Sequence, residues 1–476
     1  MNTSRIGRKL EAIFPRGIRK SGAEPGFLIV VGLLGLLFLM GGSARADISS
    51  LPLLRPLTVL AAAYGMWTMQ AQHWRDGRWL LGVLGACFIL VLLHATPLPP
   101  SFWQSLPGRG IVVEIDKAAG IEDQWRPISL APAATWNAFY ALFVPLAVLT
   151  NGIKLSREDH ERLLVILLGM GFASGLLAVL QLLGSPRSAL YLYRITNEGE
   201  GVGFFANRNH QAVFLSSMFP LLAAYAAGKG KSRTSDRRRL AGAALAGLLL
   251  IPIILISGSR TGLATSLVGL AMIPMLYRAW IPKGRKGQKA NRQFVFGVAG
   301  LTLVVASLAA WASLADRAVA IRRMLGETGG AELRLEYWPV IVHAIPEYLP
   351  LGSGIGSYER VYQVIEPASQ LRAVYSNHAH NDFLEVALTA GIPGLALVFA
   401  VAVLIFCSAV RVVGLSRERQ AQAKWGWLGI AIVVIASLAS LTDYPLRVPL
   451  LSAWFVIACL WVRLGATATR IAGPAS

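Results

Sequence analysis

Residues 375–394 read YSNHAHNDFLEVALTAGIPG, in which a polar loop with two histidines runs directly into an apolar segment. Asp382 followed three residues later by Glu385 is typical of an N-cap with a capping box, so the sequence predicts a helix that begins about one residue after Asp382. His378 and His380 then lie just outside the positively polarised end of this helix, where backbone amides favour an anion. If the helix spans a membrane, the histidines lie at the membrane face, in a place that suits chemistry on a phosphate.

Two other interpretations of this loop stay open. His378, His380 and Asp382 are also compatible with a solvated helix cap that has no chemical role. A His-x-His pair in an extended segment places both imidazoles on one side, which also suits a metal ion. Against a metal site, a helical carboxylate follows the pair and no second histidine cluster occurs in the sequence.

The composition indicates an all-α polytopic membrane protein. The chain has 476 residues, of which 55% are hydrophobic and 15% are charged. Its mean hydropathy of +0.55 is too high for an ordinary soluble protein of this size. The formal charge of +20 does not indicate nucleic-acid binding, because no basic helix with interleaved aromatic residues occurs. Cys87, Cys407 and Cys459 all fall in apolar runs, so we expect small core residues and no disulfide in an outer loop.

Apolar runs long enough to cross a bilayer predict about 12 transmembrane helices. They lie at residues 26–43, 51–70, 79–97, 132–151, 163–183, 210–227, 240–257, 262–280, 294–314, 383–408, 425–442 and 447–466. An amino terminus on the inside gathers most of the 45 Lys and Arg residues into inner segments, so both termini are expected in the cytoplasm. The first run precedes Ser43-Ala44-Arg45-Ala46, which resembles a signal-peptide cleavage site, but a retained helix is favoured.

This topology divides the chain into five parts. They are a basic cytoplasmic amino terminus at residues 1–25, helices 1–9 at 26–314, a large outer loop between spans 9 and 10 at 315–382, helices 10–12 at 383–466, and a cytoplasmic tail at 467–476. Two shorter outer loops, residues 98–131 and 184–209, are also large enough to contribute to a site.

The third outer loop is too apolar and aromatic for a linker, so we expect it to fold over the membrane surface. Its segment ELRLEYWPVIVHAI places Arg334, Trp338, Ile341 and Ile345 on one helical face, as in a short interfacial helix. The following LGSGIGSYERVY allows tight turns and close approach of a ligand at three glycines, Gly352, Gly354 and Gly356.

Three arginines are expected on the outer side of the membrane. Arg260 lies in SGSRTG, residues 257–262, which joins two spans almost without a loop, and Arg208 lies at the mouth of a span in NRNH. An arginine in such a place is expensive unless it meets an anion, although its long side chain also allows it to snorkel to water. With Arg334 they supply planar two-point contacts for phosphate oxygens, and His380 can accept a proton from a hydroxyl. The set therefore fits transfer of a group from a diphosphate donor to a hydroxyl acceptor.

The sequence contains no Asp-x-Asp pair that would hold a metal diphosphate. Glu114 and Asp116 in EID are the nearest substitute, and we interpret them as a solvated loop pair. Positive side chains, and not magnesium, are then expected to neutralise the leaving diphosphate. In the last outer turn, LTDYPLRVP, Asp443 and Arg447 either pair locally, which we take as the default, or contact sugar.

These motifs resemble the O-antigen ligase and polymerase superfamily of bacterial inner-membrane, GT-C-like glycosyltransferases. The resemblance rests on GFFANRNH, SGSRTG, RLEYW followed by PLGSGIGSY, and above all AHNDFLEVALTAGIPG, and it covers residues 200–400 best. It implies transfer of an oligosaccharide or polysaccharide from undecaprenyl diphosphate at the periplasmic face, without metal and without a cofactor.

The resemblance also implies roles for individual residues. His380 matches the family's essential histidine, which is proposed to activate the acceptor hydroxyl, and Arg260 and Arg334 match arginines that bind the diphosphate, with Arg208 as a possible helper. Secondary candidates from the same motifs are His378, Asn381, Asp382, Asn207, Asn209 and Arg360.

The acceptor is either a growing glycan, as in a polymerase of surface or exopolysaccharide, or lipid A core, as in a ligase of lipopolysaccharide; the extra outer segments slightly favour the polymerase. Membrane lipids surround the protein, and a flippase and a chain-length regulator are partners that the resemblance implies. The alternative from another class is a transporter or flippase of lipid-linked sugars. It is disfavoured because its spans would carry polar residues through their depth, whereas here they gather at the outer face.

Overall fold

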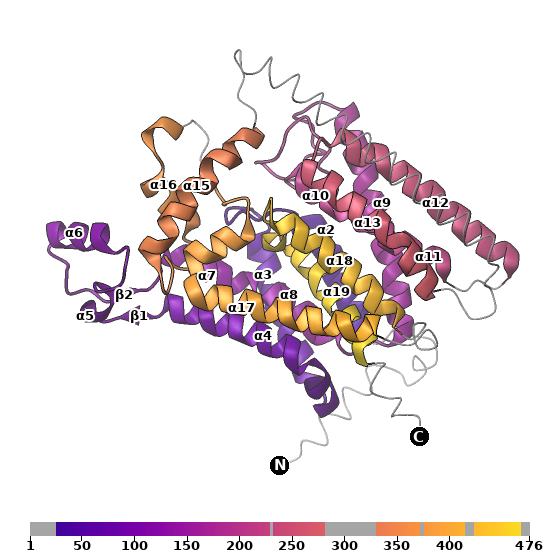
Figure 1. Cartoon of the computed structure of the whole chain (residues 1–476), viewed down its shortest axis with the longest axis horizontal. Helices are drawn as coiled ribbons and strands as arrows, with labels where there is room; N and C mark the ends of the chain where they lie inside the picture. Colours follow the sequence, from indigo (N-terminus) through magenta and orange to yellow (C-terminus); the bar gives the residue numbers. More distant parts are fainter. Residues whose placement is uncertain (1–24, 229–231, 281–329, 372–375, 415–422, 468–476) are drawn as a thin grey trace.

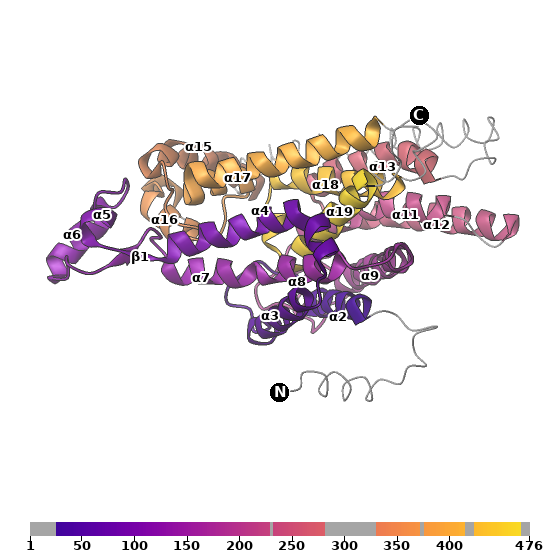
Figure 2. The same cartoon turned by 90° about the horizontal axis from the view of Figure 1, so that it is seen from below.

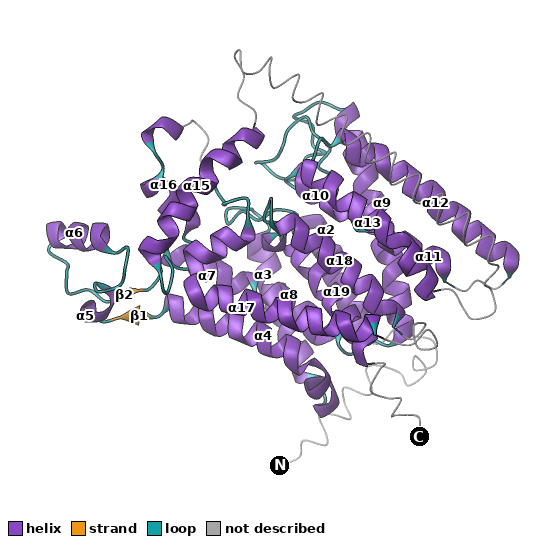
Figure 3. Ribbon diagram, viewed as in Figure 1, coloured by secondary structure: helices purple, strands orange, loops and turns teal. Residues whose placement is uncertain are grey.

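The computed structural model describes residues 25–228, 232–280, 330–371, 376–414 and 423–467, which form a bundle of α-helices (Figure 1). The only strands in these ranges are β1, Pro97–Leu98, and β2, Arg126–Pro127, which pair antiparallel with Pro97 opposite Pro127. Figure 3 shows how little of the molecule they occupy. The all-α class expected from the composition is therefore observed.

The first half of the chain supplies the helices on one side of the bundle. They are α2 Pro25–Met40, α3 Leu51–Trp67, α4 Ala71–Ala95, α5 Pro100–Trp103, α6 Gly110–Ala119, α7 Pro132–Ala141, α8 Phe143–Gly152 and α9 Arg157–Leu183. The helix α9 begins with a capping box, in which Ser156 Oγ accepts from the Asp159 amide and the Asp159 carboxylate accepts from the Ser156 amide.

The chain from residue 208 onward supplies the remaining described helices. They are α10 Arg208–Ser216, α11 Met218–Ala227, α12 Arg233–Ile256, α13 Arg260–Trp280, α15 Gly330–Tyr348, α16 Tyr358–Ile365, η2 Ala368–Gln370, α17 Asp382–Val413, α18 Lys424–Ser440, η3 Pro445–Arg447 and α19 Pro449–Thr467. Figure 2 shows α17 along one side of the bundle and α2 and α3 along the opposite side.

Six described helices are long and apolar enough to cross a membrane. They span Ala71–Ala95, Pro132–Gly152, Arg157–Leu183, Thr234–Ile256, Asp382–Val413 and Pro449–Ala466. Each predicted apolar run coincides with a described helix or a pair of helices, except 294–314, which lies outside the described residues. The total of 12 spans therefore stays a prediction, and so do the bounds of the loop at 315–382, of which only 330–371 and 376–382 are described.

The main core lies where α18 and α19 cross the other central helices. Trp461 and Leu428 are fully buried in it, and α2 contributes Leu34 and Leu37. The crossing is close because it is lined by glycines: a Cβ added at Gly465 would lie 2.4 Å from the Cα of Gly426. By contrast, α12 and α17 expose large apolar side chains such as Leu249 and Phe406, as expected of helices that face lipid.

The helix α17 is broken at Gly391, which has φ 57° and ψ −147°. Carbonyl groups next to the break lose their intrahelical partners, and the segment 351–357, here called the glycine loop, replaces them. Its Ser353 amide donates to Leu388 O at 2.9 Å and its Gly354 amide to Thr389 O at 2.8 Å. These two hydrogen bonds hold the glycine loop against the first turns of α17.

The three glycines of this loop approach protein backbone. All have positive φ, and a Cβ at Gly352 would lie 2.6 Å from Thr389, one at Gly354 2.3 Å from Ser129 Cα, and one at Gly356 2.8 Å from Ala134 O. The tight turns expected at these glycines are therefore present, and the space on the side of each missing Cβ is filled by α17, α7 and the segment before α7. Substitution by any L residue would be strained at these positions.

The apolar face predicted for α15 exists, but it packs on protein. Ile341 is fully buried, and Trp338 Nε1 donates to Ala379 O at 2.9 Å. This face of the helix therefore supports the histidine loop, whereas Val342 on another face is exposed. Arg334 lies one turn before Trp338, and its side chain is outside the described residues.

Candidate active site

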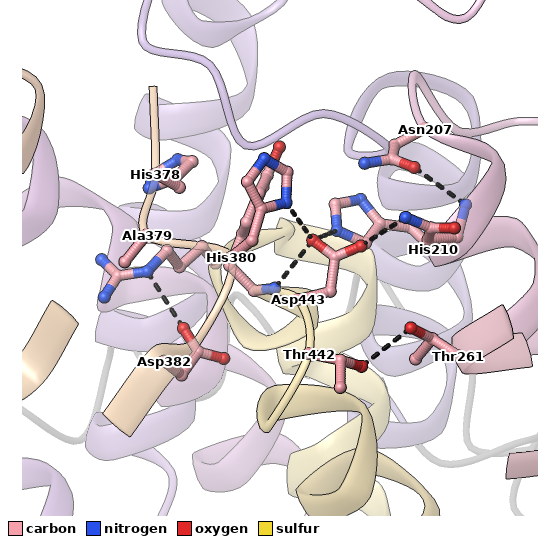
Figure 4. Close-up of polar contacts among 12 residues, drawn as sticks. Asn207, His210, Thr261, His378, Ala379, His380, Asp382, Thr442 and Asp443 are labelled. Carbon is pink, nitrogen blue, oxygen red and sulfur yellow. Dashed lines mark hydrogen bonds and ion pairs between the residues drawn. The ribbon is translucent and has the colours of Figure 1, made fainter. Parts of the chain in front are cut away.

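The polar segments of the chain meet at one end of the bundle, here called the site end. The Ala206 amide donates to Gly42 O, and the Leu450 amide to Gly41 O, which ties the start of α10 and of α19 to the end of α2. The turn at residues 441–448 lies at the centre of the site end, as Figure 4 shows.

Asn381, and not Asp382, caps α17. Its side-chain oxygen accepts from the amides of Phe383 at 3.0 Å and Leu384 at 3.1 Å, so Asp382 is the first helical residue. The capping box predicted for Asp382 and Glu385 is wrong. Both carboxylates pair with Arg447, and Glu385 also contacts His378. Asn is as good an N-cap as Asp, and the sequence offered both in succession.

His380 is held in a strained position above this cap. Its φ is 49°, the left-handed region that a non-glycine residue rarely adopts. Its Nδ1 lies 3.2 Å from Asp443 Oδ1 (Figure 4). An N–H at Nδ1 leaves Nε2 with a lone pair directed away from Asp443, which is the form that can accept a proton. The left-handed backbone at His380 departs from the extended His-x-His segment that the sequence suggested.

Asp443 is buried, with 1% of its surface exposed. Asn209 Nδ2 donates to its Oδ2 at 2.7 Å, and the Tyr444 amide donates to Oδ1 at 3.0 Å. His210 Nε2 lies 3.7 Å from Oδ1. Burial by itself raises the pKa of this carboxyl, but the contacts with His210 and His380 outweigh it and hold the pKa well below its usual value. Asp443 is therefore an ionised carboxylate that orients His380.

A second histidine–carboxylate pair lies beside the first. His378 Nδ1 is 3.1 Å from Glu385 Oε1, and the Ala379 amide donates to Oε2 at 3.0 Å. Arg447 completes this network: its Nε donates to Asp382 Oδ1 at 3.1 Å and its Nη1 lies 3.1 Å from Glu385. Glu385 is 1% exposed, so its charge is balanced inside the protein.

The expected local pair between Asp443 and Arg447 is not formed. Asp443 pairs with His380. Arg447 pairs with Glu385, the carboxylate that contacts His378. The turn 441–448 therefore helps to position both histidines of the loop, His380 directly through Asp443 and His378 through the Arg447–Glu385 pair. The sequence carried a signal for this role, since the turn places two charged residues between two apolar runs.

Tyr444 separates the two networks. Imidazole rings pack against its ring at centroid distances of 4.1 Å for His378 and 5.0 Å for both His210 and His380. Its hydroxyl is hydrogen-bonded by Asn207 and Asn377, and burial raises the pKa of the phenol, with Asp443 adding to the effect. Tyr444 thus stays protonated and joins the loop before α10 to the histidine loop.

The SGSRTG turn reaches the same place. Thr261 Oγ1 and Thr442 Oγ1 are 2.8 Å apart, which joins the start of α13 to the residue before Asp443. Arg260 is the first residue of α13 and its side chain is exposed at the site end. The structure therefore brings Arg260 to the surroundings of the histidine loop.

Arg208 also lies at the site end, at the start of α10. Its Nη1 is 2.6 Å from Glu200 Oε1. A Cβ added at Gly258 would lie 3.6 Å from Arg208 Nη1. The guanidinium therefore lies over the SGSRTG turn while paired with Glu200. Asn207 caps α10 by accepting from the Asn209 amide at 2.8 Å.

Other predicted residues lie apart from this group. Arg360 is exposed and its Nη1 donates to Gln363 of its own helix at 3.3 Å. Glu114 and Asp116 are in α6 and not in a loop, and Asp116 is buried and paired with Arg126 at 2.5 Å, so the interpretation as a solvated loop pair is wrong for Asp116. In the ranges that the structure describes, no group of three or more His, Cys, Asp or Glu side chains is placed to hold a metal ion.

Three residues that contact the histidine–carboxylate pairs were not selected as site residues from the sequence. They are His210, Glu385 and Tyr444. His210 and Tyr444 adjoin the motif residue Asn209 and the charged residue Asp443, but nothing local marks them, because their partners lie more than 60 residues away.

Several apolar helices long enough to cross a membrane, with a histidine–carboxylate cluster at one end of the bundle, indicate a multi-pass membrane protein. Residues 245–399 match the family model Wzy_C, described as O-antigen ligase. The match, which includes His378 and His380, supports a relation of this part of the chain to the O-antigen ligase and polymerase superfamily. No curated protein matches the chain.

Proposed function

We propose that the protein transfers an oligosaccharide or polysaccharide from undecaprenyl diphosphate to a sugar hydroxyl, with the site end facing the periplasm. The observation that carries this proposal is the His380–Asp443 pair, a partly exposed imidazole oriented by a buried carboxylate. Such a pair is suited to deprotonate a hydroxyl. The family match supports a ligase or polymerase type of activity and gives no support to a transporter of lipid-linked sugars.

In the proposed reaction, the acceptor hydroxyl gives its proton to His380 Nε2 while its oxygen attacks the anomeric carbon of the donor sugar. The bond from that carbon to the diphosphate oxygen breaks, the electron pair leaves with the diphosphate, and the configuration at the carbon is inverted. Asp443 stabilises the imidazolium that forms, because its carboxylate stays ionised and 3.2 Å from Nδ1.

Arginine side chains are proposed to balance the charge of the leaving diphosphate. Arg260 begins α13 next to Thr261, which contacts the turn of Asp443, and Arg208 lies over the same segment. Arg334 belongs to the helix whose Trp338 contacts Ala379. All three therefore belong to segments that meet around the histidine loop, and guanidinium groups suit two-point contacts with phosphate oxygens.

The proposed partners are the undecaprenyl-diphosphate-linked glycan and an acceptor, either a growing glycan or lipid A core. A flippase that delivers the donor and a chain-length regulator would act with the protein in the inner membrane. Neither a cofactor nor a metal takes part in the proposed reaction.

The test compares cells that lack the protein and carry either the wild type or one variant. His380→Ala is expected to lower transfer by about 10²–10⁴-fold, the usual contribution of a general base. Arg260→Lys is expected to impair transfer, because an ammonium loses the two-point contact. His343→Ala, a change of an exposed histidine in α15, serves as the matched control.

The measured quantities are the surface polysaccharide and the lipid-linked intermediates. In cells without activity, long polymer that persists on the lipid carrier identifies a ligase, and single repeat units identify a polymerase. Wild-type polysaccharide in His380→Ala cells would refute the proposed mechanism.

A further inference from the structure

A third histidine faces the carboxylate that orients His380. His210 lies in the first turn of α10, is 2% exposed, and has neither ring nitrogen hydrogen-bonded to any described residue. Its Nε2 is 3.7 Å from Asp443 Oδ1, the same oxygen that His380 Nδ1 contacts at 3.2 Å. Two imidazoles thus share one carboxylate oxygen from opposite sides (Figure 4).

The position of His210 is closely constrained. Asn207 caps the helix that carries it, and the next residue in the helix, Gln211, accepts from Ser174 Oγ at 2.6 Å. The edge of the Tyr444 ring packs on the imidazole at an interplanar angle of 78°. Burial of a polar ring costs free energy unless a polar group faces it, and the Asp443 carboxylate is the group that faces this ring.

Few charged groups besides Asp443 face this ring from the elements packed on α10. Among the described residues at the site end, the titratable or charged ones on these elements and on α10 itself are Asp443 and Tyr444 of the turn, His380 of the histidine loop, Arg260 of α13 and Arg208 of α10. Arg208 is paired with Glu200, so Asp443 is the carboxylate that lies against His210.

We propose that His210 is a positioning residue that acts on His380 through Asp443. This inference rests on the proposed function. An N–H of His210 that is directed at Asp443 helps to fix the carboxylate, which then holds His380 with its proton on Nδ1 and its lone pair on Nε2. The acceptor proton passes to His380 alone, and His210 exchanges no proton during the transfer.

Loss of this contact has a specific kinetic consequence. A carboxylate that is free to turn holds the His380 imidazole less well in the orientation from which Nε2 takes the acceptor proton, so kcat falls. His210 is buried behind Asp443, so the KM for the donor is expected to stay unchanged.

The experiment uses the full-length protein in liposomes. The donor is lipid-linked glycan extracted from cells that lack the protein, and the lipid fraction of the same cells supplies the acceptor. Release of undecaprenyl diphosphate is measured at a series of donor concentrations, which gives kcat and KM for the wild type, His210→Gln, His210→Leu and the control His343→Gln. A glutamine keeps an N–H donor, whereas a leucine does not.

His210→Gln is expected to keep transfer within about tenfold of the wild type, because it keeps an N–H donor. His210→Leu is expected to lower kcat more than His210→Gln, with the KM for the donor unchanged. Thermal unfolding of both variants checks that they fold, and equal kcat in the two folded variants would overturn the inference. If His210→Leu does not fold, His210→Gln decides: a changed KM for the donor with unchanged kcat would overturn the inference.

His380→Ala, measured in the same liposomes, separates the two proposals. If it releases undecaprenyl diphosphate at the wild-type rate, the proposed function fails. If it is inactive while folded His210→Leu keeps the kcat of His210→Gln, only the role of His210 fails.

Discussion

Asp443 is the residue on which the candidate site depends most. It accepts from Asn209 and from its neighbouring backbone amide, and it lies against two imidazoles while 1% exposed. A buried carboxylate with this many donors is held in a single orientation, and each donor strengthens the case for the ionised form. The same contacts that orient His380 therefore make Asp443 a part of the folded structure's stability.

Replacement of Asp443 by Asn tests this stability through its pH dependence. The pKa of Asp443 is lowered on folding, so its contribution is fully present above the ordinary carboxyl pKa of about 4 and is lost as the pH falls through the lower folded value. Asp443→Asn should therefore lower the melting temperature in detergent most at neutral pH. The difference from the wild type should shrink in acid below about pH 4.

The control for this measurement is Asp123→Asn, because Asp123 is exposed in the loop after α6. Its melting temperature should follow that of the wild type at every pH. A difference between wild type and Asp443→Asn that stays constant into strong acid would show that Asp443 is not ionised in the folded protein.

Sequence reasoning at the scale of residues recognised the types of side chain but not their partners. Asp443 and Arg447 are four positions apart, so a local pair is the simplest interpretation, yet each binds a residue more than 60 positions away. Likewise Asn381 and Asp382 both suit an N-cap, and the choice between them depends on Arg447, which attracts Asp382. Such choices are made by tertiary contacts, which one sequence does not display.

Among the secondary-structure elements, the broken helix α17 positions the histidine loop. Its first part ends at Gly391, where the glycine loop supplies the amides that continue the hydrogen bonding. Arg109 secures the glycine loop from the other side: it is 2% exposed, and its Nη2 donates to Gly352 O at 3.2 Å and to Ile128 O at 2.5 Å. The first outer loop thus supports the site indirectly.

A substitution of Gly354 by Ala should disrupt this support. Gly354 has φ 111°, and an added Cβ would lie 2.3 Å from Ser129 Cα, which is backbone and has no room to move. We expect a loss of about 1–3 kcal/mol of unfolding free energy, as is usual for a residue forced into a sparsely populated backbone region. Chemical denaturation in detergent, read by tryptophan fluorescence, measures it.

The matched control is Gly82→Ala in α4, where a Cβ would meet nothing within 4 Å. This change should leave stability the same or raise it by about 0.5–1 kcal/mol, because alanine is the better helix former. Equal effects of the two substitutions would mean that the glycine loop does not depend on close packing.

Helices were the elements that the sequence predicted best. An apolar run is a local property, so each described helix that lies in the bundle core or faces lipid was marked by its own residues. Two features were not marked by hydropathy. The helix α4 begins at Ala71, ahead of the apolar run at 79–97, because its first turns are polar. The break in α17 depends on hydrogen bonds to the glycine loop, which hydropathy does not reflect.

Across the whole molecule, the site end is assembled from segments that are far apart in the chain. The loop before α10, the turn before α13, the histidine loop and the turn before α19 all meet there, joined by the pairs Asn209–Asp443, Thr261–Thr442 and His380–Asp443. The sequence indicated this gathering through topology alone, by placing arginines and histidines on one side of the membrane. It did not indicate that the turn 441–448 is the common partner.

A disulfide between Cys residues at positions 261 and 442 tests this assembly. The two threonine hydroxyls are 2.8 Å apart, so Thr261→Cys together with Thr442→Cys should form a disulfide under mild oxidation. Mass spectrometry of protease fragments detects the linked peptides. The native cysteines lie within α4, α17 and α19 and serve as internal references.

The comparison variant combines Thr442→Cys with Thr68→Cys, because Thr68 follows α3 and bonds to Lys154 after α8. No disulfide is expected there. Failure of the first pair to link, with both thiols accessible to a maleimide, would show that the start of α13 does not meet the turn 441–448.

The turn 441–448 also limits how this protein can be recombined with its relatives. The family match ends at residue 399, yet Asn209, His210, Asp443, Tyr444 and Arg447 all lie outside it. A chimera that exchanges only the matched segment would join one protein's histidines to another protein's carboxylate and tyrosine. Segment exchanges with related proteins should therefore transfer the histidine loop, the start of α10 and the turn before α19 together.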